Sequence, residues 1–367
     1  MQQGSLTYKY ESVQALRLVA AVLVVITHST LYAHDRLDHR FSVWGFGTIG
    51  VDVFFVISGF VMMVSSSRHL EERRYWKKFA LRRIVRIGPM YWIATTVKLL
   101  TLLVLPGAVL HAALNPGKAA LSYLFLPSRN VDGNLEPLLG VGWTLVFEMA
   151  FYAIFTLALV VRANVIVFCA IILSLLALGS IFVDHVTGPA VSFYLDPIVL
   201  YFLVGMVIAK WTLDRSWQRM AAWFGYILLL WVTIYSFDSH DGFDFGQLAR
   251  NIGVTAVFLA VILAEPILSR RIPRAVVFMG DASYSLYLFH PLLAPAVPVV
   301  LGKLHLISQP LSVLLSVVGV LVSAAFIYRF VERPITRRLQ HLLLSPRRAT
   351  VQDKESSRAS GASRSDR

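Results

Sequence analysis

The chain has 367 residues, of which 57% are hydrophobic and only 15% are charged, and it carries a formal net charge of +13 at pH 7. Soluble domains carry about 25% charged residues, so this composition excludes an ordinary soluble enzyme. The single cysteine, Cys169, excludes a disulfide framework and a cysteine-rich metal centre, and we expect no metal.

Apolar runs of about 20 residues, the length of a membrane span, recur along the chain. The sequence therefore predicts an all-α polytopic membrane protein with about ten transmembrane helices. The expected spans are 13–32, 46–64, 89–109, 141–161, 164–183, 191–209, 220–236, 247–266, 275–300 and 310–331.

The basic residues indicate the orientation. With the N-terminus in the cytoplasm, 25 Lys and Arg residues fall on the cytoplasmic side, five fall in outer loops and four lie within spans. This asymmetry is the positive-inside pattern, so we expect both termini in the cytoplasm and a multi-pass protein of the bacterial inner membrane. Because the positive charge is divided among membrane loops and a tail, it does not indicate nucleic-acid binding.

The chain contains no linker long enough to separate two soluble domains. Residues 1–344 are expected to form one integral-membrane domain. Residues 345–367 are rich in Ser and Arg and poor in apolar side chains, which predicts a disordered cytoplasmic tail.

The first span contains the segment RLVAAVLVVITH, with Arg17 and His28 eleven residues apart. Eleven residues make three helical turns plus roughly 20°, so the two side chains share a face about 16 Å apart along the axis. This spacing suits a long carrier arm that is held at Arg17 and reaches His28.

Ionisable residues inside spans are costly and need a partner or a function. Five of them are expected in the outer half of the membrane, on five different helices. We therefore expect one polar cavity, open to the outside, in which a carboxylate orients His28 as a general base and other groups bind substrate. Interhelical ion pairs, with Arg250 neutralising a carboxylate, are the alternative. The five residues are His28, Asp52, Glu148, Asp196 and Arg250.

The stretch 68–92 is strongly basic and ends in aromatic residues. Orientation of the protein and anchoring to anionic lipid headgroups explain most of this charge. However, Arg82 and Arg86 would share a helical face, with Arg83 adjacent. Guanidinium groups converging near Arg17 would bind phosphates well.

The sequence resembles the membrane-bound acyltransferase family 3, and within it the exopolysaccharide-production (ExoZ-like) O-acetyltransferase branch. The resemblance covers residues 11–336. In many members two acidic residues are adjacent where this chain has Glu148 followed by Met149. The matching motifs are ALRLVAAVLVVITH, GVDVFFVISGF, RRIVRIGPMYW, GWTLVFEMAFY, GDASYSLYLFHP and YRFVERPI.

The resemblance implies transfer of an acyl group, most often acetyl, from cytoplasmic acyl-coenzyme A to a hydroxyl of an extracytoplasmic or lipid-linked saccharide. Polysaccharide-biosynthesis machinery is an expected partner. The family's essential pair corresponds to Arg17 and His28, and its basic loop to the arginines of 82–86. The remaining matched residues are Asp52 and Glu148, expected to be catalytic, and His290, expected to bind substrate with Asp196 and Arg250.

Two questions stay open from the sequence. The acyl group could pass directly to the acceptor, with His28 removing its proton, or through an acylated side chain such as Ser58, Ser283 or Ser285. Direct transfer is favoured because no serine, nor Cys169, adjoins a base in a motif. The second question is the class of protein, because a transporter or flippase of lipid-linked sugars would also have ten helices and buried charges.

Overall fold

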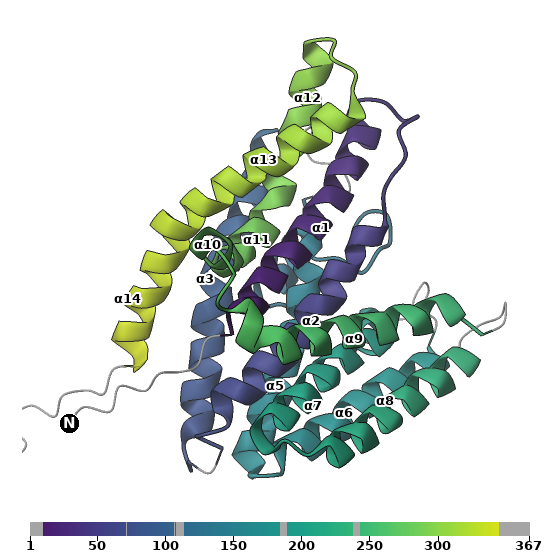
Figure 1. Cartoon of the computed structure of the whole chain (residues 1–367). Coiled ribbons are helices and arrows are strands. Elements are labelled where there is room, and N and C mark those ends of the chain that lie inside the picture. The colour runs from purple at the N-terminus through teal and green to yellow at the C-terminus, as the bar shows by residue number, and fades with distance from the viewer. Residues whose placement is uncertain are drawn as a thin grey trace, which may run out of the picture.

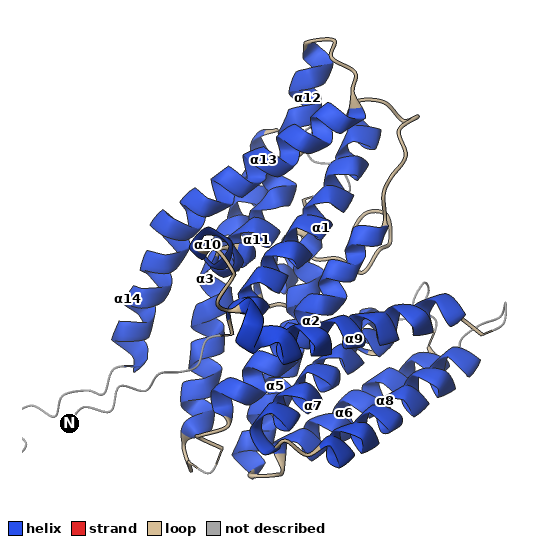
Figure 2. Ribbon diagram, in the orientation of Figure 1, coloured by secondary structure: helices blue, strands red, loops and turns tan. Residues whose placement is uncertain are grey.

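The computed structural model describes residues 10–70, 72–105, 107, 114–183, 189–237 and 243–344, and within them the fold is helical with no strand (Figure 2). The predicted tail, residues 345–367, lies outside the described residues. The α-helices are α1 (Glu11–Arg36), α2 (Ile49–Ser66), α3 (Tyr75–Val104), α4 (Pro116–Tyr123), α5 (Trp143–Val161), α6 (Val165–Gly179), α7 (Leu200–Asp214), α8 (Trp217–Phe237), α9 (Phe245–Leu268), α10 (Arg274–Asp281), α11 (Ser283–Leu293), α12 (Ala296–Lys303), α13 (Gln309–Ile327) and α14 (Arg333–Leu344).

Ten helical segments among the described residues are long and apolar enough to cross a membrane, which confirms the predicted class. Three boundaries differ from the prediction. The third helix begins at Tyr75 rather than near residue 89, so most of the basic stretch lies in the same helix as the span, as expected from the helical face of Arg82 and Arg86. The ninth span is broken into α10, α11 and α12, and the tenth helix continues into α14 through a π-helical turn, Tyr328–Glu332.

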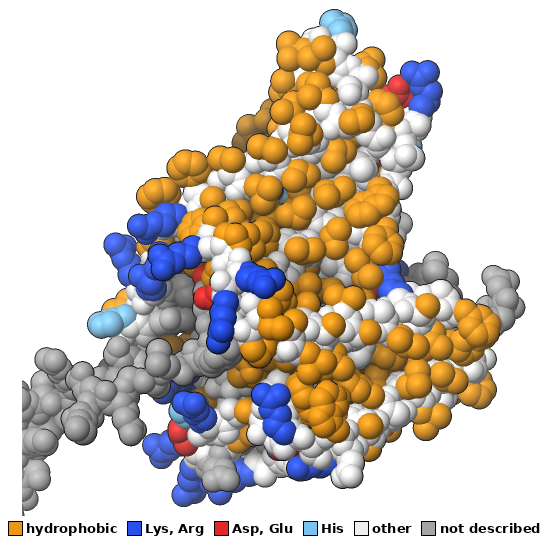
Figure 3. Space-filling model, viewed as in Figure 1, with side chains coloured by type: hydrophobic (Ala, Val, Ile, Leu, Met, Phe, Trp, Pro, Cys, Tyr) orange, Lys and Arg blue, Asp and Glu red, His pale blue; other side chains and the backbone are white. Residues whose placement is uncertain are grey.

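The helices form two groups that meet at α2 (Figure 1). One group contains α1, α10, α11 and α13, which pack on one another. The other contains α6, α7, α8 and α9, at the lower right of the view. Helix α2 packs against both α1 and α7, and apolar side chains cover much of the visible surface, while Lys and Arg gather toward the lower left (Figure 3). The position of α2 therefore decides how the two groups are joined.

Helices α2 and α7 approach each other through a pair of glycines. A Cβ on Gly59 would lie 2.0 Å from the carbonyl oxygen of Phe202, and a Cβ on Gly205 would lie 2.0 Å from that of Val56. Small residues allow transmembrane backbones to pack closely where the hydrophobic effect provides no force between helices. This contact fixes the height of α2, and with it the positions of Asp52 and Ser58.

Substitution of Gly59 by Ala should destabilise the protein by about 1–3 kcal/mol, because the new methyl group meets backbone that no rotamer change can move. Gly319→Ala on α13 is the matched control, since nothing lies within 4 Å of a Cβ there. It should be neutral or stabilising by up to about 1 kcal/mol. Thermal unfolding in detergent compares the two variants, and equal midpoints would refute the packing role of Gly59.

Candidate functional site: three polar cavities

The first cavity, which we call the arginine cavity, has a volume of about 320 Å³ and is lined by residues from α1, α2, α3, α5, α10 and α11. It contains the side chains of Arg17, Arg83 and Arg86, together with the carboxylates of Glu148 and Asp281. Three guanidinium groups and two carboxylates line it, and a third carboxylate, that of Glu332, pairs with Arg86, so the cavity offers clustered guanidinium donors rather than a net charge. Such a cavity suits a phosphate-bearing ligand.

Each of the three arginines donates a hydrogen bond to a side chain outside its own helix. Arg17 Nε donates to Ser283 Oγ at 3.2 Å, and Arg83 Nη2 donates to Ser65 Oγ at 3.2 Å. Arg86 Nη1 lies 3.3 Å from Glu332 Oε1. These bonds leave other N–H donors of each planar guanidinium available to a ligand.

The π-helical turn explains how Glu332 reaches Arg86. A π-turn inserts one extra residue into the helix and changes the direction of the side chains that follow. Glu332 is the last residue of the turn, is 1% exposed, and also accepts a hydrogen bond of 2.6 Å from Ser285 Oγ. Glu332 therefore neutralises one of the three arginines from the C-terminal part of the chain.

The structure corrects one member of the predicted arginine cluster. Arg83 and Arg86 line the arginine cavity, but Arg82 does not. Arg82 and Arg83 point about 100° apart on the helix, on opposite sides of Arg86, and the cavity lies on the Arg83 side. Of the three arginines expected on α3, two therefore line this cavity.

Glu148 lies on the arginine side and not beside His28. Its Oε1 accepts hydrogen bonds from Ser58 Oγ at 3.1 Å and from the hydroxyl of Tyr152, one helical turn away. The guanidinium of Arg83 lies over the Tyr152 ring, 5.9 Å from its centroid. Glu148 and Tyr152 thus form part of the support for the arginines.

The second cavity, which we call the histidine cavity, has a volume of about 660 Å³ and is lined by residues from α1, α3, α11 and α12 and from the segment before α5. His28 lines it, together with polar side chains that include Lys98 and Glu136. The expected carboxylate partner of His28 is replaced by another histidine. The His28 and His290 rings lie 4.9 Å apart between centroids.

Both histidines have one ring nitrogen fixed by a backbone carbonyl. His28 Nδ1 lies 3.0 Å from Val24 O, and His290 Nδ1 lies 2.7 Å from Tyr287 O. A carbonyl can only accept, so Nδ1 of a neutral ring carries the proton and Nε2 keeps its lone pair. His28 can therefore accept a proton through Nε2 from a molecule in the histidine cavity.

Pro291 makes the carbonyl of Tyr287 available to His290. A helical N–H at position 291 would bond to the carbonyl of residue 287, but proline has no N–H. The imidazole of His290 takes this acceptor instead, and His290 Nε2 is buried without a hydrogen-bond partner among the described residues. The sequence HP thus fixes the orientation of a fully buried ring behind His28.

A thin layer of side chains separates the two cavities. The Tyr287 hydroxyl donates to Val141 O at 3.1 Å and lies 3.0 Å from Thr144 Oγ1. Tyr287 and Thr144 line the arginine cavity, whereas Val141 lines the histidine cavity. Phe54 packs edge-on against Tyr287, with the ring centroids 5.7 Å apart. Any arm that connects Arg17 to His28 has to pass this layer.

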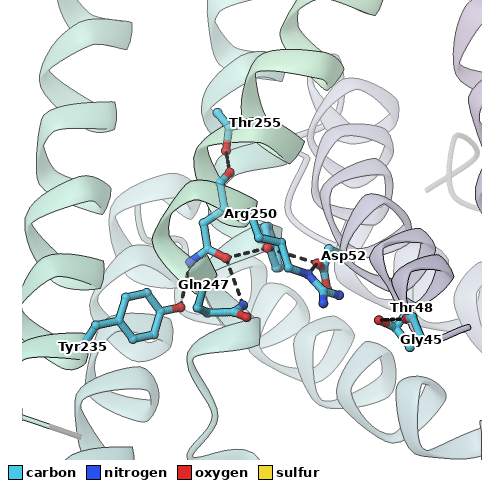
Figure 4. A network of polar contacts seen from close by, with 9 residues as sticks. Gly45, Thr48, Asp52, Tyr235, Gln247, Arg250 and Thr255 are labelled. Carbon is cyan, nitrogen blue, oxygen red and sulfur yellow. Dashed lines mark hydrogen bonds and ion pairs between the residues drawn. The ribbon is translucent and has the colours of Figure 1, made fainter. Parts of the chain in front are cut away.

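The third cavity, which we call the aspartate cavity, has a volume of about 490 Å³ and lies among α2, α7, α8 and α9. It is lined by Asp52, Asp196 and Arg250, with Asp244 and several neutral polar side chains. Arg250 Nε donates to Asp52 Oδ2 at 2.6 Å, and Figure 4 shows this pair within a wider network. The expected interhelical ion pair of Arg250 is thus present.

The prediction of a single polar cavity open to the outside is wrong. Its five expected members are divided among the three cavities: His28 in the histidine cavity, Glu148 in the arginine cavity, and Asp52, Asp196 and Arg250 in the aspartate cavity. The catalytic roles expected for Asp52 and Glu148 beside His28 therefore lose their geometric basis.

The candidate acyl carriers are all engaged in other contacts. Ser58 donates to Glu148, Ser283 accepts from Arg17, and Ser285 donates to Glu332. Cys169 is fully buried within the core cluster, as expected for a packing residue. Ser58 and Ser285 thus each adjoin a carboxylate that could act as a base, contrary to the expectation from the sequence, so these contacts do not decide between direct transfer and a serine relay.

Sequence reasoning missed two tyrosines that shape the site. Tyr152 supports Glu148, and Tyr287 closes the layer between the cavities. Each lies in a motif already singled out, and Tyr152 follows Glu148 by four residues, which is a helical contact distance. That spacing was the available signal for Tyr152, whereas the position of Tyr287 depends on packing across helices.

One group of described side chains could hold a metal ion. His34, Asp35 and His39 place one ligand atom each within 4.8 Å of one another at the end of α1. His34 Nδ1 lies 2.8 Å from Phe41 O, which leaves Nε2 for a ligand. Asp35 also lines the histidine cavity, but no role in acyl transfer follows from this group.

Comparison with known proteins identifies the family. Residues 10–329 match the family described as "Acyltransferase domain". The chain is 32% identical over 313 residues to the exopolysaccharide production protein ExoZ of Rhizobium meliloti, covering 84% of this chain and 94% of that protein. No solved structure matches the chain.

Two further relatives are longer. The chain is 26% identical to the putative peptidoglycan O-acetyltransferase YrhL of Bacillus subtilis, over 86% of this chain and 53% of that protein. It is 24% identical to the O-acetyltransferase OatA of Staphylococcus aureus, over 88% of this chain and 56% of that protein. The chain thus spans about half the length of these two relatives.

The match along most of the chain decides between the enzyme and the flippase that the sequence alone leaves open. The chain belongs to the membrane-bound acyltransferase family 3, and it is an acyltransferase.

Proposed function

We propose that this protein transfers an acyl group, in the first instance acetyl, from cytoplasmic acyl-coenzyme A to a hydroxyl of an extracytoplasmic or lipid-linked saccharide such as an exopolysaccharide. The observation that carries the proposal is the position of Arg17 and His28 in two adjacent cavities along one helix, α1. The printed names of the relatives support a polysaccharide acceptor.

The donor binds at the arginine cavity in this proposal. Its phosphates contact Arg17, Arg83 and Arg86 near the end of α1 that the basic residues assign to the cytoplasm. Its flexible arm runs along α1 and passes Tyr287 and Thr144. The rise of about 16 Å between Arg17 and His28 matches an extended carrier arm.

The transfer takes place in the histidine cavity. His28 Nε2 removes the proton of the acceptor hydroxyl as its oxygen attacks the thioester carbonyl. The C–S bond breaks, and the proton passes from the imidazolium to the departing thiolate. The His290 ring lies 4.9 Å from the His28 ring between centroids, and its Nε2 has no hydrogen-bond partner among the described residues, so its lone pair can stabilise the charged His28 ring.

Replacement of His28 by Ala should abolish acetyl transfer, with an expected loss of at least about 100-fold, because the general base is removed. Expression and membrane insertion should be unchanged, since a small apolar residue is well tolerated in a span. Transfer of radiolabelled acetyl groups from acetyl-coenzyme A to cell-envelope glycan measures the effect. Full activity of this variant would refute the proposed mechanism.

Arginine-to-lysine variants test the donor site. Arg83→Lys and Arg86→Lys should each weaken acetyl-coenzyme A binding by about 1–2 kcal/mol, because lysine lacks the bidentate geometry. That energy corresponds to a roughly five- to thirty-fold loss of affinity. Arg82→Lys is the matched control, since Arg82 lies on the same helix but outside the cavity.

Calorimetry on the purified protein separates the two roles of these arginines. If the arginines only orient the protein in the membrane, their positive charge is all that matters, and lysine keeps that charge. All three Lys variants would then bind acetyl-coenzyme A as the native protein does. Equal weakening in all three, including Arg82→Lys, would contradict the cavity as the donor site.

Pro291→Ala tests whether the orientation of His290 matters. The new backbone N–H at position 291 would compete for the carbonyl of Tyr287 and release the His290 ring. We expect acetyl transfer to fall about tenfold in kcat, with the donor KM and the unfolding midpoint unchanged or the midpoint raised. Pro266→Ala on α9 is the matched control and should leave kcat unchanged.

A further inference from the structure

The end of α1 and the turn that follows it bring three candidate metal ligands together, and the reaction proposed above uses none of them. His34, Asp35 and His39 each place one ligand atom so that the three atoms lie within 4.8 Å of one another. Imidazole and carboxylate are ligands that first-row divalent metals such as Zn²⁺ accept. The single cysteine excludes a cysteine-rich metal centre, but this group needs no thiolate.

Backbone hydrogen bonds fix the turn that carries His39 back toward α1. Asp38 N donates to Ala33 O at 3.1 Å, and Phe41 N donates to Asp38 O at 3.0 Å. In a continuous helix, residues 34 and 39 would point about 140° apart. The turn instead places the His34 and His39 rings edge to face, with 5.3 Å between centroids and 75° between planes.

His34 is oriented as metal-binding histidines usually are. Its Nδ1 lies 2.8 Å from Phe41 O, and a carbonyl can only accept, so Nδ1 of the neutral ring carries the proton. Its Nε2 keeps a lone pair for a ligand. Metal-binding histidines commonly donate their other ring N–H to a backbone carbonyl or carboxylate, which fixes the ring and makes the ligand nitrogen more basic. His34 therefore already makes the supporting contact of a metal ligand.

The charges around the group favour a cation. Arg40 directly follows the group, but its Nε and Nη2 both donate to the Asp38 carboxylate, at 3.0 and 2.7 Å. Arg36 lines the histidine cavity, which also contains the opposite charge of Glu136. The carboxylate of Asp35 and the carbonyls at the C-terminal end of α1 both attract positive charge. The two neighbouring arginines thus each have a carboxylate close by, and the group keeps its attraction for a metal ion.

We propose that His34, Asp35 and His39 bind one Zn²⁺ ion, which ties the turn after α1 to the end of the helix. Two imidazoles favour such a metal over Mg²⁺ and Ca²⁺, which prefer oxygen ligands. Three protein ligands leave the fourth position of a tetrahedral ion to water or to another molecule. Because Asp35 also lines the histidine cavity, the ion would fix one wall of that cavity.

Calorimetry on the full-length protein in detergent tests the site. The protein is purified through a tag without histidine, freed of metal with a chelator, and titrated with Zn²⁺ in an excess of Mg²⁺. We expect one Zn²⁺ per chain with a Kd of about 10 µM or lower. Weaker binding, or binding that Mg²⁺ displaces, would overturn the proposal.

His39→Ala removes an exposed ligand and should weaken Zn²⁺ binding at least about tenfold. Asp35→Asn keeps the size of the side chain but removes its charge, and it should weaken binding as well. His69→Ala is the matched control, because His69 is also a surface histidine beside a carboxylate, with its Nδ1 2.5 Å from Glu72 Oε1. It should bind Zn²⁺ as the native protein does. Native affinity in His39→Ala, or an equal loss in His69→Ala, would refute the site.

Hydrogen exchange tests whether the ion ties the turn to the helix. Saturating Zn²⁺ should slow backbone amide exchange in residues 37–45 at least about fivefold, because an ion that binds only the closed turn opposes local opening. His39→Ala should exchange at the same rate with and without Zn²⁺. Exchange in the native protein that Zn²⁺ does not change would overturn the structural role of the ion. The outcome is independent of acetyl transfer, so the metal site and the proposed function fail separately.

Discussion

The burial of charge in a membrane is the constraint on which the rest of this structure depends. Each guanidinium inside the helical bundle has to find a partner there, because the lipid offers none. Arg17 finds Ser283, Arg86 finds Glu332 and Arg250 finds Asp52, and every one of these bonds joins helices that are far apart in sequence. The same bonds that satisfy the arginines therefore also align α1, α3 and α9 with their neighbours at the arginine cavity and the aspartate cavity.

The sequence predicts the number of spans well because an apolar run of about 20 residues has few alternatives to crossing a membrane. It also predicts that Arg17 and His28 share a face of α1, since this follows from helical geometry alone. It cannot predict which cavity a residue lines. Position along a span gives an approximate depth, but Asp52 and Glu148 reach different cavities because their helices pack in different directions. That packing depends on contacts such as Gly59 against Phe202.

Two local departures from regular helix explain the parts of the site that pattern reasoning does not reach. Pro291 removes a backbone N–H and thereby gives His290 a fixed acceptor, and the π-turn before α14 turns Glu332 toward Arg86. Both are visible in the sequence only as ordinary residues, HP and YRFVE. Their effect requires knowing which carbonyl is left without a donor, or which neighbouring helix is in reach. A membrane helix tolerates such breaks where side chains can satisfy the freed backbone groups.

The separation into cavities also bears on how a thioester could be protected from water. In the proposed reaction, hydrolysis competes with transfer whenever water reaches the thioester before the acceptor does. Tyr287, Thr144 and Phe54 lie between the charged arginine cavity and the histidine cavity, and the Tyr287 hydroxyl is already bonded to Val141 O. A layer whose polar atoms bond to one another offers little to solvating water. The arm of the donor would fill this layer as it passes, so that the thioester meets the base only when the path behind it is closed.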